Sequence, residues 1–94
     1  MNSEIAKALE YITAIEQIIK PYEYEVPEAS HCLKDLRAIK ELLKNPTWDN
    51  IAQAVEKLKT IETRINYYRG YEAAEEALIY INKLKNMARN HGFL

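Results

Sequence analysis

Residues 61–84 read IETRINYYRGYEAAEEALIYINKL, and the fold depends on what the chain does at Gly70 within them. Apolar residues recur every three or four positions on both sides of this glycine, which is the spacing of one face of a helix. If Gly70 breaks the helix, the two flanking segments form separate antiparallel helices. If the helix continues, the interior glycine costs only about 1 kcal/mol, and the long rod exposes an apolar stripe that needs a second chain.

The charges after Gly70 favour the break. Acidic residues come directly after it, at 72, 75 and 76, and basic residues come at the end of the segment, at 85, 89 and 91. Acid at the start and base at the end complement the dipole of an independent helix. Most globular helices are also short. The sequence therefore predicts that a third helix ends near Gly70 and a fourth begins just after it.

Prolines mark the boundaries of the first half of the chain. Pro21 ends a helix predicted over residues 3–20, and Pro27 suits the first turn of a second helix that ends near residues 45–46. Between them, PYEYEVP at 21–27 alternates aromatic and acidic residues and is predicted to be an extended connector. Thr47 is a good N-cap for the third helix.

These helices carry apolar stripes that together can form one core. The predicted core residues are Ile5, Ala8, Leu9, Ile12, Ile15, Ile18, Ile19, Ala29, Cys32, Leu33, Leu36, Ile39, Leu42, Leu43, Ile51, Ala54, Val55, Leu58, Ile61, Ile65, Tyr68, Ala74, Ala77, Leu78, Ile81, Leu84 and Ala88. We therefore predict an all-α fold, an antiparallel up-down four-helix bundle that forms a single domain over residues 1–94. The alternative is three helices, with a long third helix through Gly70, in a dimer.

Composition limits the function. The chain has 94 residues, of which 48% are hydrophobic and 29% charged, with a formal net charge of −1. This balance is typical of a globular domain that is too small for a deep catalytic cleft. It also argues against a nucleic-acid partner, whose binding depends on phosphate neutralisation. With one cysteine, no signal-peptide pattern and no long apolar run, we expect a cytoplasmic protein that does not insert into membranes.

One segment has the spacing of a metal or thiol site. Glu28 and His31 form an E-x-x-H pair of the kind that faces the metals in di-iron bundles. The second pair is missing, because Ala88 stands where His91 would need a glutamate. Cys32 lies on the apolar stripe and points away from its neighbour His31, as a core cysteine does. We expect no catalytic residue, no metal and no cofactor, and a metal-dependent or thiol enzyme at these residues is the least favoured hypothesis.

Tyrosine is the unusual feature of the composition, with seven residues against one Phe and one Trp. In an up-down bundle, the 21–27 connector and the turn around Gly70 lie at the same end. That end then gathers the residues we predict to bind a partner: Tyr22, Tyr24, Arg64, Tyr67, Tyr68, Arg69 and Tyr71. Tyrosine and arginine are enriched in binding hot spots. The simpler interpretation is that the tyrosines close the end of the bundle with their hydroxyls in water.

In size and layout the chain resembles the small helical bundles that bacteria use as adaptors, as bacteriocin-immunity proteins and as phage- or plasmid-borne regulators. The resemblance implies a binding role and carries no motif over to particular residues. The sequence thus favours a non-catalytic adaptor whose partner is another protein or a second copy of the chain. The alternatives are a nucleic-acid-associated regulator that uses the same end together with Lys83, Lys85 and Arg89, or a small bacterial immunity-type bundle protein.

Overall fold

The computed structural model describes residues 2–94, which form four α-helices and one short 3₁₀ turn. The helices are α1 (Asn2–Ile19), α2 (Pro27–Leu43), α3 (Trp48–Asn66) and α4 (Glu72–Asn90), and the 3₁₀ turn η1 (Lys20–Tyr22) directly follows α1. Each helix boundary lies within a few residues of the predicted one.

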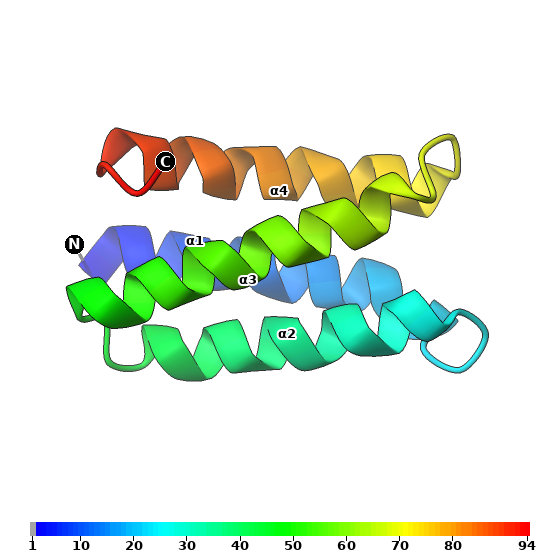
Figure 1. Cartoon of the computed structure of the whole chain (residues 1–94), viewed down its shortest axis with the longest axis horizontal. Helices are drawn as coiled ribbons and strands as arrows, with labels where there is room; N and C mark the ends of the chain where they lie inside the picture. Colours follow the sequence, from blue (N-terminus) through cyan, green and yellow to red (C-terminus); the bar gives the residue numbers. More distant parts are fainter. Residues whose placement is uncertain (1) are drawn as a thin grey trace.

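The helices run up and down in a bundle of 36 × 21 × 19 Å (Figure 1). Contacts join α1 to α2, α2 to α3, α3 to α4 and α4 back to α1, and the α2–α3 and α1–α4 pairs are the most extensive. The predicted four-helix bundle is therefore confirmed. The α1–α2 and α3–α4 connections lie at one end of it, and the α2–α3 connection, the start of α1 and the C-terminus lie at the other (Figure 1).

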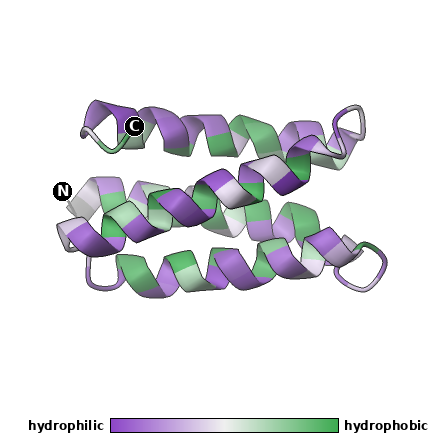
Figure 2. Ribbon diagram, viewed as in Figure 1, coloured by the Kyte–Doolittle hydropathy of each residue, from purple (hydrophilic) through white to green (hydrophobic). Residues whose placement is uncertain are grey.

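The four apolar stripes meet in one core. Hydrophobic and hydrophilic residues alternate around each helix (Figure 2), and every buried side chain among the described residues is apolar. Ile15, Leu36, Ile61 and Ile81, one from each helix, are completely buried. Burial of such side chains contributes about 1.5–3 kcal/mol each, so the pairing of stripes, more than helix propensity, holds the bundle together.

The chain reverses direction between α3 and α4 at Gly70. This residue has a φ of +100°, a conformation that glycine adopts readily and other residues avoid. The Tyr68 N–H donates to the Ile65 carbonyl at 2.9 Å and closes the end of α3. The alternative of one long helix through Gly70 is therefore wrong, because the backbone at this residue is not helical.

Replacement of Gly70 by alanine should change the free energy of unfolding in opposite directions for a turn and for a continuous helix. A Cβ at this position would meet no atom within 4 Å, so its cost lies in the positive φ alone. We expect Gly70→Ala to lower the free energy of unfolding by about 1–2 kcal/mol, as measured by urea denaturation. A continuous helix would instead gain about 1 kcal/mol from the same change, so an increase in stability would contradict the observed turn.

The connection between α1 and α2 is compact, and the prediction of an extended connector is wrong. Pro21 occupies the first turn of η1, where its missing N–H leaves no hydrogen bond unmade. The N–H groups of Glu25 and Val26 both donate to the Tyr22 carbonyl, at 3.1 and 3.0 Å. This tight turn places Tyr22 close to the end of the bundle.

Candidate functional site

The end of the bundle that carries the α1–α2 and α3–α4 connections contains a cleft of about 390 Å³. All four helices contribute to it. Four of the predicted partner-binding residues line this cleft: Tyr22, Arg64, Tyr68 and Tyr71. We call it the tyrosine cleft. The sequence pattern thus predicts residues that the fold brings together from two separate segments of the chain.

The floor of the tyrosine cleft is apolar and built largely from small side chains. Ile19, Val26 and Ile65 come from the ends of the helices, and Ala29, Ala74 and Ala77 lie on α2 and α4. Alanine at three facing positions leaves space that leucine or isoleucine would fill. The run of alanines at 73, 74 and 77 is the signal in the sequence that could have indicated a hollow here.

A hydrogen bond at the tyrosine cleft joins the α3–α4 connection to the first turn of α2. The Tyr68 hydroxyl donates to the Glu28 carboxylate, and both side chains are half-buried. This bond stabilises the charged form of the carboxyl group and lowers the pKa of Glu28, with a smaller contribution from the Arg64 charge. The same bond raises the pKa of Tyr68. It fixes the turn after α3 against the first turn of α2.

Removal of this bond gives a pH-dependent effect on stability. Because folding lowers the pKa of Glu28, its ionised carboxylate stabilises the folded state at pH values above the ordinary pKa of 4.5. This contribution is lost as the pH falls through the folded-state pKa. Because folding raises the pKa of Tyr68, its protonated hydroxyl stabilises the folded state at pH values below the ordinary pKa of 10.0. This contribution is lost as the pH rises through the folded-state pKa. The loss in the free energy of unfolding caused by Tyr68→Phe should therefore be largest near neutral pH.

Urea denaturation of both proteins across the pH range checks this expectation. The difference in the free energy of unfolding should shrink below pH 4.5 and above pH 10.0. A difference that stays constant with pH would show that the Tyr68–Glu28 bond does not form in solution.

Arg64 brings an unsatisfied donor to the tyrosine cleft. Its Nε is buried, and no group in the described part of the chain accepts a hydrogen bond from it. Leaving such a donor unpaired costs about 1–3 kcal/mol, and more for a charged group. The side chain emerges from the last turn of α3 and lines the cleft. An acceptor supplied by a bound molecule would satisfy it.

The rim of the tyrosine cleft carries more negative than positive charge. Glu25, Glu28 and Glu72 line it together with Arg64. Among residues 2–94, Glu25 and Glu72 form no ion pair with a basic side chain. The cleft therefore favours a neutral acceptor near Arg64 and a cation at its edge. In the sequence, Glu28 stands out only as half of an E-x-x-H pair and Glu72 only as acid at the start of a helix, and neither is predicted to bind a partner.

The other three predicted residues lie outside the tyrosine cleft. Tyr24 and Tyr67 are 95% and 81% exposed and project from the two connections. Arg69 lies 3.6 Å from the Glu75 carboxylate, which also accepts a hydrogen bond from the Gly70 N–H at 3.1 Å. Arg69 thus helps to hold the turn, and the exposed tyrosines surround the cleft without forming its wall.

The three residues with the spacing of a metal or thiol site, Glu28, His31 and Cys32, lie close together at the start of α2 but in different surroundings. Glu28 binds Tyr68, while His31 is exposed. Cys32 forms part of the cleft wall but is 2% exposed, and its burial raises its pKa to about 11. Its thiol therefore stays protonated near neutral pH and is a poor nucleophile. Residues 2–94 contain no group of three metal-ligating side chains.

Comparisons with known proteins add no relative. No protein-family model matches the chain, and no curated protein or solved structure shows significant similarity to it. Within the described part of the chain, no helix has the length and hydropathy needed to cross a membrane. The case for function therefore depends on the tyrosine cleft itself.

Proposed function

We propose that this chain is a non-catalytic adaptor that binds a segment of another protein in the tyrosine cleft. One observation carries the proposal: an apolar cleft of about 390 Å³ whose wall contains a buried Arg64 Nε without an acceptor. A peptide segment can supply both an apolar group for the cleft and an acceptor for the Arg64 Nε–H. One of its apolar side chains fills the floor, and one of its backbone carbonyls accepts the Arg64 hydrogen bond.

The charges of the rim select the kind of segment. A carboxylate near Arg64 would also approach Glu25 and Glu72, and like charges repel. A neutral backbone carbonyl avoids this repulsion. A lysine or arginine next to the apolar side chain can pair with Glu25 and Glu72, which form no ion pair within residues 2–94. The segment we propose is therefore apolar with a basic flank.

The tyrosines suit such a partner. Tyr22 and Tyr71 are 42% and 67% exposed, so each presents ring surface at the cleft while its backbone is held by a helix end or turn. Tyrosine brings a large amphipathic contact area at a small cost in side-chain entropy. A cation at the rim also gains attraction from the ring faces.

Four short synthetic peptides of equal length test the proposal by titration calorimetry. Each has leucine or serine at its centre and lysine or glutamate on its flanks. We expect saturable binding only for the leucine peptide with lysine flanks, and weaker binding at higher salt because the rim ion pairs are exposed. Binding that ignores the flanking charge, or no binding by any of the four, would contradict the proposal.

Two variants and one oligonucleotide complete the test. Glu72→Gln should weaken binding of the lysine-flanked peptide, whereas Glu76→Gln, on the same helix but outside the tyrosine cleft, should not. A single-stranded DNA oligonucleotide should not bind. If it binds instead of the peptides and its affinity falls steeply with salt, the nucleic-acid alternative replaces the adaptor.

A further inference from the structure

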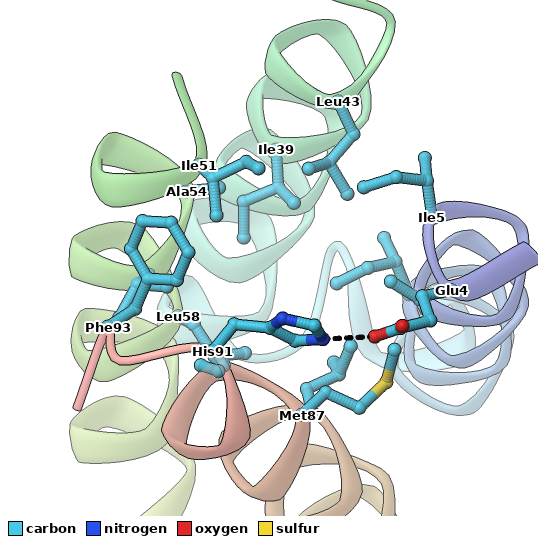
Figure 3. A pocket seen from close by; sticks show the side chains of 15 residues that line it. Glu4, Ile5, Ile39, Leu43, Ile51, Ala54, Leu58, Met87, His91 and Phe93 are labelled. Atoms are coloured by element: carbon cyan, nitrogen blue, oxygen red, sulfur yellow. Dashed lines mark hydrogen bonds and ion pairs between the residues drawn. The ribbon is translucent and has the colours of Figure 1, made fainter. Parts of the chain in front are cut away.

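A second cavity lies at the opposite end of the bundle, where the start of α1, the α2–α3 connection and the C-terminal residues meet (Figure 3). Its volume is about 100 Å³, and all four helices line it. Ile5, Ile51, Leu84 and Met87 are among the side chains that surround it, and Ala54 and Ala88 leave the space open. We call it the terminal cavity.

The polar side chains of the terminal cavity are paired with each other. Glu4 and His91 are the lining residues with charged or ring-nitrogen groups, and the His91 Nε2 contacts the Glu4 carboxylate (Figure 3). This pair links the end of α4 to the start of α1. A buried water needs two to four polar partners. The terminal cavity therefore suits an apolar occupant better than water.

The C-terminal residues fold back over this site. Gly92 has a φ of +82°, and after it the Phe93 N–H donates to the Ala88 carbonyl at 2.9 Å. The Phe93 ring lies against Trp48, with 4.3 Å between the ring centroids, and it also lines the cavity. An aromatic side chain near the C-terminus thus forms part of the wall of this cavity, which is partly open to solvent.

We propose that the terminal cavity binds a small, uncharged apolar group, either a ring or a short alkyl chain. An apolar cavity of about 150 Å³ in another protein stays dry and binds benzene or xenon, and the terminal cavity is somewhat smaller and likewise apolar. No charged head group is required, because the polar groups of Glu4 and His91 already contact each other. The group can be a free hydrocarbon or the end of a longer acyl chain.

Methyl NMR of the full chain under xenon pressure tests the site directly. We expect saturable shifts of the methyl resonances of Ile5, Ile51 and Met87. Ala54→Leu fills the cavity from α3 and should abolish these shifts. Ala52→Leu is the matched control, because it lies on the same helix and does not line the cavity. Ala88→Leu fills the site from α4 and serves if Ala54→Leu does not fold.

Two further ligands identify the source of the apolar group. Benzene alone shifting the same methyl groups would indicate a free hydrocarbon. Shifts with decanoate as well would indicate the end of an acyl chain. The inference fails if xenon produces no saturable shift at these methyl groups, or if the shifts persist unchanged in both Ala54→Leu and Ala88→Leu.

Discussion

Tyr71→Ala should weaken binding of the leucine peptide with lysine flanks by at least about 30-fold. Truncation of a hot-spot tyrosine costs about 2 kcal/mol or more, and each 1.4 kcal/mol changes the dissociation constant about tenfold. The Tyr71 ring lines the tyrosine cleft and is 67% exposed, so its removal should leave the core intact. Titration calorimetry measures the loss, and circular dichroism shows that the helical content is unchanged.

The chain offers matched controls for this variant. Tyr24 and Tyr67 lie at the same end of the bundle but outside the tyrosine cleft. Tyr24→Ala and Tyr67→Ala should each change the dissociation constant less than about threefold, because exposed rim contacts contribute little. If all three alanine variants lose binding equally, the partner covers the whole tyrosine-rich end, and the tyrosine cleft does not provide most of the binding energy.

Ile61→Ala should lower the free energy of unfolding by about 2–5 kcal/mol, because loss of a buried isoleucine removes apolar contacts and leaves a cavity. Ile61 is completely buried on α3, in the same core cluster as Leu36 and Ile81. A domain of this kind has about 5–15 kcal/mol of stability in total. The variant should therefore unfold at a much lower urea concentration than the parent protein.

Ile79→Ala is the control for this prediction. It makes the same substitution on α4 at a side chain that is 56% exposed, and it should change the stability by about 0.5 kcal/mol or less. If Ile79→Ala destabilises the protein as much as Ile61→Ala, the face of α4 that carries Ile79 is buried in solution, by a second copy of the chain or by another surface.

The helices and the core could be predicted from the sequence because each helix carries one regular apolar stripe. The stripe on residues 51–65 becomes the buried face of α3, and Ala74 to Leu84 form that of α4. The break at Gly70 followed from the acidic residues after it. The spacing alone did not determine it, because a continuous helix preserves the same periodicity. The positive φ of Gly70 is visible only in the folded backbone.

The tyrosine cleft could be predicted only in part. Up-down connectivity brings Tyr22, Tyr68 and Tyr71 to one end, whatever the details of packing. The exposure of Tyr24 and Tyr67 could not be predicted, because it depends on the direction of side chains in short turns. The Tyr68–Glu28 bond joins residues 40 positions apart, and the hollow between them depends on how closely the helices approach.

The Arg64 Nε–H resonance in a ¹⁵N-labelled sample reports most directly whether the tyrosine cleft binds the peptide. Among residues 2–94 no group accepts a hydrogen bond from this donor. We predict that the leucine peptide with lysine flanks moves this resonance downfield as it gains a hydrogen bond, and shifts the backbone amides of Ala29 and Ala74 in the cleft floor. An Arg64 signal that stays in place while the peptide binds, with shifts confined to Tyr24, Tyr67 or the terminal cavity, would show that the peptide does not bind in the tyrosine cleft.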